Sequence, residues 1–174
     1  MKTLRLFVTA VLLLVLAGCS VQSSQLSTLM SIVRAPSMDM SGNIWTLEYG
    51  DYQAAVYAVN ASDATMFSNT IGDHIVFDGW AITDVAILNQ NRFQMRLETA
   101  ASGERKYLRD TLVTRIHLCA PWQREDTING VLFIQSCEGV NGYTNSILVD
   151  SEGAIAEIIQ SVDGSSSKLR LIKS

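Results

Sequence analysis

Arg92-Phe93-Gln94-Met95-Arg96-Leu97-Glu98 is the stretch of this 174-residue sequence that decides the fold class. Polar and apolar residues alternate along it, which is typical of a β-strand with one face in a core and the other in water. From Asn43 onward the chain keeps this period of two, and no long helical pattern interrupts it. We therefore predict that residues 44–174 form a β domain.

Turn residues divide this region into further short strands. Asp150-Ser151-Glu152-Gly153 has the chemistry of a hairpin turn whose last position, Gly153, is left-handed. Turn signals recur roughly every 8–15 residues, which favours an antiparallel all-β domain. The other predicted strands are Ala54–Val59, His74–Phe77, Ala81–Leu88 (with a helical turn as its alternative), Thr111–Cys119, Val131–Cys137, Asn145–Val149, Ala154–Gln160 and Lys168–Lys173.

A short amphipathic helix is predicted upstream of the β region, near residues 25–34. The apolar residues that recur at the spacing of one helical face are Leu26, Leu29, Met30 and Val33. Ser23 or Ser24 can cap this helix, and Ala35-Pro36 would end it. The apolar face of such a helix packs on the protein's own domain or lies on a membrane or a partner protein. We favour packing on the protein's own domain.

The N-terminus has the pattern of a lipoprotein leader. Positive charge in Met1–Arg5 precedes an apolar run, Leu6–Leu16, which is too short for a membrane-spanning helix of about 20 residues. Leu16-Ala17-Gly18-Cys19 resembles the lipobox of bacterial lipoproteins. The resemblance implies cleavage before Cys19, which then carries diacylglycerol and an N-acyl chain. Two or more lipid chains anchor a protein stably in a membrane, whereas one chain does not. Ser20 stands where aspartate often marks inner-membrane retention, which favours the outer membrane.

The domain organisation that follows is a signal peptide at 1–18, a lipidated tether with the short helix at 19–43, and the β domain at 44–174. Removing Lys2 and Arg5 with the signal reduces the basic residues from 13 to 11, against 17 acidic ones, a formal net charge of −6. This charge argues against a nucleic-acid partner and against broad adhesion to anionic lipid.

Cys119 and Cys137 are the cysteines that remain beyond Cys19. If their two strands form a hairpin around Pro121–Gly130, the cysteines lie opposite each other, which suits a disulfide when their Cβ atoms approach closely. An even number in an oxidising compartment favours a structural disulfide, with two free thiols as the main alternative. Zinc ligands normally come in closer doublets, and a redox pair is usually spaced C-x-x-C. We predict no metal site and no cofactor.

No established catalytic motif is present in the chain. Asp73, His74 and Asp78 form the densest cluster of chemically useful residues, and a hydrolase could use His74 as a base. We favour the simpler interpretation that a strand lies between two turns. His117 is two residues from Cys119 and is predicted to be packed or hydrogen-bonded, not a ligand.

The three tryptophans, Trp45, Trp80 and Trp122, are possible ligand-binding residues, because an aromatic face can stack on the apolar face of a sugar. Scattered tryptophans more often belong to the core. Both interpretations stay open at this point.

The C-terminal third resembles a known family. The segment 141–155 ends a strand in Val149-Asp150 and turns at Gly153; a strand with Gln160 and a last strand, Leu169–Lys173, follow. This is similar to the closing pattern of the YjbF family of capsule- and exopolysaccharide-associated outer-membrane lipoproteins. Residues 69–85 resemble the family's Gly-Arg-Ile…Gly…Asp-Leu segment, and the lipobox and N-terminal helix also fit.

The chain departs from the family at several positions. Leu148 stands where the family favours tryptophan, Asp73-His74 replaces the arginine of Gly-Arg-Ile, and the chain ends in Lys173-Ser174 without the family's proline. The specific part of the resemblance covers about 50 residues. It implies a curled, bifurcated antiparallel sheet and a role in surface-polysaccharide production or export, but it transfers no catalytic residues.

We therefore expect a mainly β fold: a single antiparallel, curled or barrel-like sheet domain with a short N-terminal amphipathic helix. The expected function is that of a non-enzymatic accessory lipoprotein of the bacterial envelope, lipid-anchored in the outer membrane and facing the periplasm or the cell surface. It would bind polysaccharide or an export partner. A lipoprotein subunit of a secretion or pilus apparatus, or a periplasmic hydrolase using Asp73, His74 and Asp78, are the alternatives.

Overall fold

The computed structural model describes residues 43–61, 63–87, 93–139 and 142–174. The predicted signal peptide, Cys19, the tether up to residue 42 and the amphipathic helix at 25–34 lie outside these ranges. Among the described residues no helix is long and apolar enough to cross a membrane.

All of the described strands belong to one antiparallel sheet of 13 strands. The first eight are β1 (Ile44–Tyr49), β2 (Tyr52–Asn60), β3 (Thr65–Ser68), β4 (His74–Phe77), β5 (Ile82–Ile87), β6 (Phe93–Thr99), β7 (Glu104–Arg109) and β8 (Leu112–Leu118). The remaining five are β9 (Gln123–Thr127), β10 (Gly130–Cys137), β11 (Tyr143–Val149), β12 (Ile155–Gln160) and β13 (Leu169–Lys173). The predicted fold class, a single curled antiparallel sheet, is confirmed.

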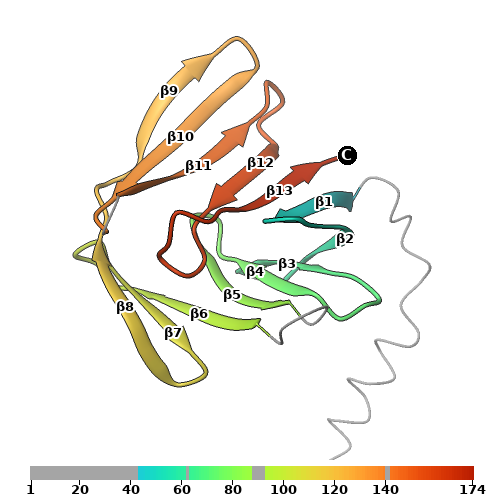
Figure 1. Ribbon diagram of the computed structural model, residues 1–174. Coiled ribbons are helices and arrows are strands. Elements are labelled where there is room, and N and C mark those ends of the chain that lie inside the picture. Colours follow the sequence, from blue (N-terminus) through green and yellow to red (C-terminus); the bar gives the residue numbers. More distant parts are fainter. Residues whose placement is uncertain (1–42, 62, 88–92, 140–141) are drawn as a thin grey trace, which may run out of the picture. The chain divides into compact units, whose positions relative to one another are not determined.

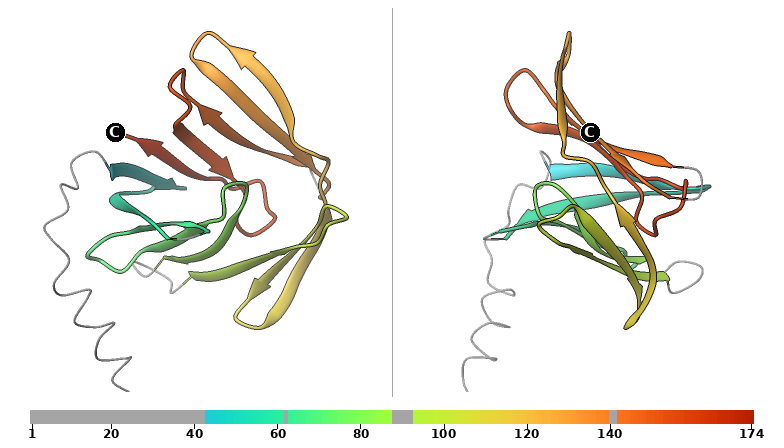
Figure 2. Two further views of the ribbon diagram at one scale, coloured as in Figure 1. Left: turned by 180° about the vertical axis from the view of Figure 1, so that it is seen from behind. Right: turned by 90° about the vertical axis from the view of Figure 1, so that its left-hand side faces the viewer.

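The sheet consists of two meanders joined at its middle. Its order runs from β8 back to β1, then across the β1–β13 ladder, and from β13 back to β9. The two edge strands, β8 and β9, are therefore neighbours in sequence although they lie at opposite ends of the sheet. Figure 1 and Figure 2 show that the sheet curls so that these two ends approach each other at one corner, from which the β7–β8 and β9–β10 hairpins diverge.

The larger hydrophobic core lies around the β1–β13 ladder. Leu47 of β1 and Leu171 of β13 are register partners, and neither side chain is exposed to solvent. The side chains packed with them include Val56, Phe67, Ile75, Ile158 and Leu169, all fully or almost fully buried. Alternate residues of the central strands point inward, as the period-two pattern predicts.

One buried glutamine connects the two meanders through the inside of the curl. The side chain of Gln160 on β12 accepts a hydrogen bond from the backbone N–H of Ile82 at 3.0 Å and donates one to the carbonyl of Trp80 at 2.8 Å. Both partners lie at the β4–β5 turn. Because both ends of the buried amide are satisfied, Gln160 stabilises the position of this turn over β12.

The hairpin that was considered between Thr111–Cys119 and Val131–Cys137 does not form, although Cys119 and Cys137 do lie opposite each other in an isolated antiparallel bridge. β8 pairs with β7, and the segment that was expected to be their loop contains β9, which forms a hairpin with β10 instead. β9 was missed because its sequence, Gln123–Thr127, is polar on both faces and fully exposed, so it has no alternation to detect.

A bulge in β8 corrects a second expectation. Strict alternation along Thr111–Cys119 would place Val113 on the face of Arg115 and His117, but the register shifts between Tyr107 and Leu108 on β7. Val113 therefore lies on the face of Ile116, because a one-residue bulge exchanges the two faces of a strand. The predicted β11–β12 hairpin is confirmed, with Gly153 at φ +85°.

Candidate functional site

The corner where the two ends of the sheet meet is closed by a disulfide. We use the name disulfide corner for residues 118–120 at the end of β8 and 136–138 at the end of β10. Cys119 and Cys137 are bonded, as predicted, with their Cα atoms 4.0 Å apart. Backbone hydrogen bonds on both sides of the bond, Ala120 N–H to Ser136 O and Glu138 N–H to Leu118 O, each measure 2.8 Å.

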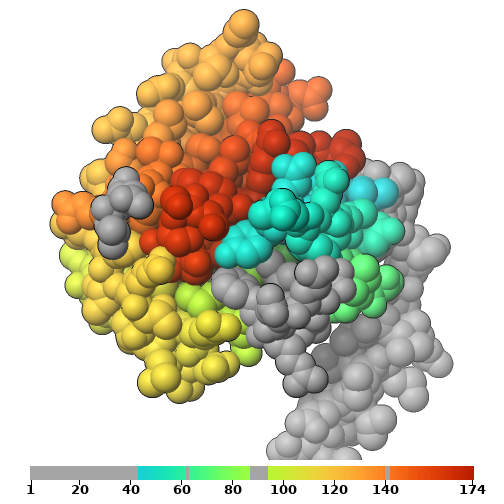
Figure 3. All heavy atoms as spheres, in the orientation of Figure 1, coloured from blue at the N-terminus to red at the C-terminus, as the bar shows by residue number. Residues whose placement is uncertain are grey.

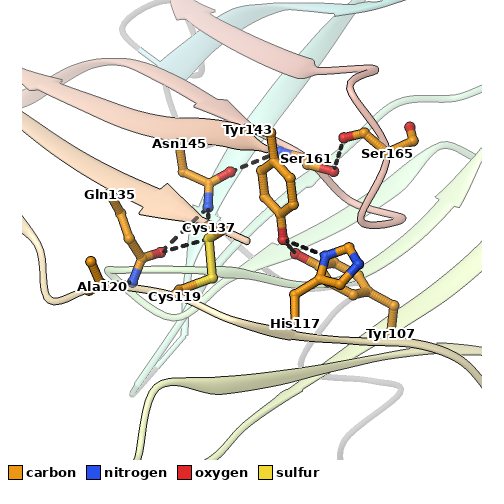
Figure 4. The surroundings of a disulfide bond; sticks show 10 residues. All are labelled: Tyr107, His117, Cys119, Ala120, Gln135, Cys137, Tyr143, Asn145, Ser161 and Ser165. Atoms are coloured by element: carbon orange, nitrogen blue, oxygen red, sulfur yellow. Dashed lines mark hydrogen bonds between the residues drawn. A yellow bond between two sulfur atoms is a disulfide. The ribbon is translucent and has the colours of Figure 1, made fainter. Parts of the chain in front are cut away.

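A polar network extends from the disulfide to the loop between β12 and β13 (Figure 4). Gln135 donates to the carbonyl of Ala120 at 3.0 Å and accepts from the Asn145 amide at 3.3 Å. Asn145, which is fully buried, in turn accepts a hydrogen bond from the Ser161 N–H at 3.0 Å. Ser161 Oγ donates to the Ser165 carbonyl at 2.8 Å. The loop between β12 and β13 is therefore positioned by the corner beneath it.

Three ring side chains share hydrogen bonds beside this network. The hydroxyls of Tyr107 and Tyr143 are 2.6 Å apart, and Nδ1 of His117 lies 3.2 Å from the Tyr143 hydroxyl. These three groups form one chain of hydrogen bonds with the Tyr143 hydroxyl in the middle.

The pKa values of this chain follow from its surroundings. Burial, and secondly the charge of Arg115, lower the pKa of His117. Burial, followed by the hydrogen bond with Tyr107, raises the pKa of Tyr143 far above its ordinary value. Both rings are therefore neutral hydrogen-bonding groups at neutral pH.

Two cationic side chains lie beside Tyr143. Arg105 of β7 is only 2% exposed, and its charge acts on the Tyr143 phenol. Lys168 places Nζ 5.4 Å from the centroid of the Tyr143 ring, and burial lowers the pKa of this ammonium group. Within the described ranges, Nε and Nη1 of Arg105 and Nζ of Lys168 are buried without a hydrogen-bond partner.

A cleft of about 390 Å³ opens next to these rings. Among the described residues its lining comes from three segments: Arg115 to His117 on β8; Gly139, Gly142 and Tyr143 before and at the start of β11; and Gly164 to Ser166 in the β12–β13 loop. Figure 3 shows this loop, in red-orange, between the yellow of β8 and the orange of β10 and β11. A Cβ on Gly164, where φ is +70°, would lie 2.9 Å from Cε1 of His117, so glycine is needed for this close approach.

The structure places Trp45 in the core and brings the other two tryptophans together. Trp45 is buried and packs edge-on against Phe67, so it belongs to the core and the prediction that it binds a ligand is not supported. Trp80 and Trp122 lie together, with ring centroids 5.6 Å apart, and Phe133 is 5.3 Å from Trp80. We call Trp80, Trp122 and Phe133 the aromatic group. Trp80 is 49% exposed, so one ring of the group is accessible from solvent.

The two carboxylates of the Asp73, His74 and Asp78 cluster each bind neighbouring groups. Asp73 is fully buried and accepts hydrogen bonds from Tyr52 and Asn69 at 2.5 and 2.6 Å. Asp78 accepts the backbone N–H groups of Trp80 and Ala81 and so shapes the turn after β4. Both carboxylates have local structural partners, as the strand-between-turns interpretation expects. The described residues contain no group of three or more His, Cys, Asp or Glu that could hold a metal.

Sequence reasoning missed Arg105, Tyr107, Tyr143 and Lys168 as site residues. Arg105 stands in a run of three charged residues, Glu104-Arg105-Lys106, which is typical of an exposed segment. Counting back by two from Tyr107 would have placed Arg105 on the inner face. Lys168 had no such signal, because its place depends on how the β12–β13 loop folds over the corner.

Comparison with known proteins gives one informative likeness. No protein-family model and no curated protein matches the chain. The fold is similar to the crystal structure of the hypothetical lipoprotein YmcC from Escherichia coli K12, with a TM-score of 0.52 and 9% sequence identity. The match covers 87% of this chain and 96% of that one. At this identity the likeness shows a shared fold.

Proposed function

We propose that this chain is a lipid-anchored, non-enzymatic accessory protein of the bacterial envelope that binds surface polysaccharide and supports its production or export. The aromatic group of Trp80, Trp122 and Phe133 carries the proposal. It combines packed rings with one accessible face, the surface on which the apolar face of a sugar stacks. The β4–β5 turn that bears Trp80 is held in place by Gln160, so the surface is preorganised.

The envelope location rests on independent observations. The leader ending in Leu16-Ala17-Gly18-Cys19 matches a lipobox, and Ser20 favours the outer membrane. The solved structure with the similar fold is itself described as a lipoprotein. The proposal therefore places lipid on Cys19 and the β domain on the periplasmic side.

Electrophoresis through gels that contain the host's own surface polysaccharide tests binding directly. Full-length lipidated protein in detergent micelles should be retarded by the polysaccharide. The double variant Trp80→Ala/Trp122→Ala should lose the retardation, because stacking surface is removed. Ile128→Ala is the matched control, since Ile128 is an apolar side chain that is 97% exposed and lies outside the aromatic group. Equal retardation of all three proteins would contradict the proposal.

A deletion strain tests the cellular role. Loss of the gene should reduce or alter surface polysaccharide, and wild-type protein should restore it. Cys19→Ser should release the protein from the membrane fraction and fail to restore the phenotype. An unchanged surface polysaccharide in the deletion strain would remove the main support for the role.

A protein partner is the second candidate function, and the edge strand β8 favours it. Its exposed apolar residues include Val113, Ile116 and Leu118, each at least half exposed. In the described sheet β8 pairs on one side alone, with β7. The other edge strand, β9, carries Arg124, Glu125 and Asp126, the kind of charge that discourages strand pairing. β8 is thus the edge to which an extended segment of another protein would add.

Photocrosslinking in cells distinguishes the possible partners. A photoreactive residue at Ile116 should crosslink to a polysaccharide-export protein, whereas the same residue at Glu125 on β9 should not. An adduct with a secretion or pilus subunit would instead support the alternative apparatus. For the hydrolase alternative, a His74→Ala variant that keeps the cellular phenotype would leave that mechanism without its base.

A further inference from the structure

The backbone of β8 leaves hydrogen-bonding groups open at a defined place. On the side of β7, Cys119 donates its N–H to the carbonyl of Gly103 at 3.0 Å. On the other side, the carbonyl of Leu118 accepts the N–H of Glu138 at 2.8 Å. Backbone groups of an antiparallel strand point alternately to its two sides. Ile116, two residues before Leu118, therefore directs its N–H and C=O away from β7, to the side where no described strand pairs with β8.

The two faces of β8 present different groups beside this free edge. Ile116 and Leu118 share one face and are 55% and 50% exposed. Arg115 lies on the other face, because side chains alternate along a strand. Arg115 is also exposed, and its Nη1 donates to the backbone carbonyl of Asp163 at 3.2 Å. An added strand would therefore meet an apolar stripe on one face and a cation on the other.

Arg115 has no carboxylate partner among the residues that the structure describes. The cations that form ion pairs there are Lys106, Arg124 and Arg170. The nearby acid Asp163 uses its carboxylate to accept the Ser165 N–H at 2.8 Å. The cleft of about 390 Å³ adjoins Arg115 and Ile116, and its described lining contains no acidic side chain. The edge of β8 therefore offers a cation, with space beside it, to an acidic side chain of another molecule.

The charge of β8 argues against a second copy of this chain as the occupant of the edge. The strand Leu112–Leu118 contains no carboxylate. No register of an antiparallel pair of two β8 strands can therefore supply a negative charge for Arg115, and one such register places Arg115 opposite the copy's Arg115. Like charges directly opposite each other destabilise a strand pair, whereas opposite charges stabilise it. The edge thus favours a different polypeptide that carries acidic residues.

We infer that β8 receives a short extended segment of a partner protein in which apolar residues alternate with acidic ones. The backbone of the segment pairs with the N–H and C=O of Ile116. Its apolar side chains cover Ile116 and Leu118, and an acidic side chain pairs with Arg115. In this mode of recognition the main chain supplies affinity and the alternating side chains supply specificity. The inference rests on the second candidate function, the protein partner, and names the chemistry of the segment that binds.

Fluorescence anisotropy with full-length lipidated protein in detergent micelles tests the inference. The probes are two labelled peptides of equal length that have valine at alternate positions and either glutamate or lysine at the positions between. The glutamate peptide should bind roughly three- to tenfold more tightly than the lysine peptide, because the side chain opposite Arg115 attracts it in one peptide and repels it in the other.

Variants at the edge locate the binding. Arg115→Glu should reverse the preference between the two peptides. Its matched control is Arg124→Glu on the opposite edge strand, β9, which should keep the wild-type preference. Ile116→Pro should abolish binding of both peptides, because proline lacks the N–H that the segment needs but is tolerated where that N–H is outside the ladder. Ile116→Ala keeps the N–H and should show weaker but measurable binding. Circular dichroism confirms that each variant is folded.

Three results with the peptides would each overturn the inference: equal binding of the two peptides, an unchanged preference in Arg115→Glu, or full binding by Ile116→Pro. A photocrosslink at Ile116 that joins two copies of the chain would also overturn it. Failure here is distinguishable from failure of the protein-partner function. A crosslink from Ile116 to an export protein in cells, combined with no preference for the glutamate peptide, removes the inference alone. A clear preference for the glutamate peptide, combined with no adduct from Ile116 in cells, removes the cellular partner alone.

Discussion

Leu47 and Arg105 are buried to nearly the same degree, but their surroundings differ. Leu47 lies in the core around the β1–β13 ladder, among apolar side chains that contact one another. Arg105 lies opposite His117 on the β7–β8 ladder, its charge acts on Tyr143, and its buried Nε and Nη1 have no hydrogen-bond partner among the described residues. The ladder core gains stability from hydrophobic burial. Around the corner, buried cationic nitrogens cost folding free energy, and a disulfide bond crosslinks the two strands.

The largest effect is expected in the ladder core. Leu47→Ala should lower the free energy of unfolding by about 2–5 kcal/mol, because it removes buried methyl groups and leaves a cavity between the central strands. Denaturant unfolding followed by circular dichroism measures this change. Leu112→Ala is the control, because Leu112 is 74% exposed and its loss should change stability by no more than about 0.5 kcal/mol. Equal effects would refute the distinction between core and surface.

Removing the disulfide should have the next largest effect. The bonded cysteines are 18 residues apart. A disulfide that closes a loop of this length restricts the unfolded chain and so adds about 3 kcal/mol to the free energy of unfolding. The double variant Cys119→Ser/Cys137→Ser should therefore unfold at lower denaturant concentration than the wild type. A stability indistinguishable from wild type would show that the backbone ladder alone holds the corner.

Replacing the buried cation should change stability in the opposite direction. Arg105→Met keeps the length of the side chain but removes a charge whose Nε and Nη1 have no hydrogen-bond partner in the described part of the chain, so the protein should become more stable by about 1–2 kcal/mol. Thermal unfolding without ligand measures the change, with Arg96→Met as the exposed control. A loss of stability in Arg105→Met would mean that the guanidinium supports the fold, and the contrast between the two regions would be wrong.

The smallest effect concerns pH. Burial and the charge of Arg115 lower the pKa of His117 in the folded protein. At pH values below the ordinary histidine pKa of about 6.5, the unfolded chain therefore binds more protons at this residue than the folded protein does. The stability that His117 contributes is present above that pH and is lost as the pH falls through it. Unfolding measured from pH 7.5 to 5.5 should show a shallower decline in His117→Gln. An identical decline would contradict the assignment.

The two regions also differ in how far their structure could be predicted. The ladder core follows the period-two pattern, and the β11–β12 hairpin follows from its turn residues, so both could be predicted from local sequence. The disulfide was predicted from the even number of cysteines beyond Cys19, but the hairpin considered for it does not form: β8 and β10 meet because the sheet curls. β9 carries charge on both faces and escaped detection. Arg105 and Lys168 became site residues through contacts between segments far apart in the chain.

Hydrogen–deuterium exchange of the lipidated protein, with and without the host's surface polysaccharide, tests most directly whether the aromatic group serves binding. We predict slower exchange around Trp122 and around the β4–β5 turn that bears Trp80, with no change in β1 and β13. Exchange that is unchanged throughout, or slowed only along β8, would contradict a saccharide-binding aromatic group.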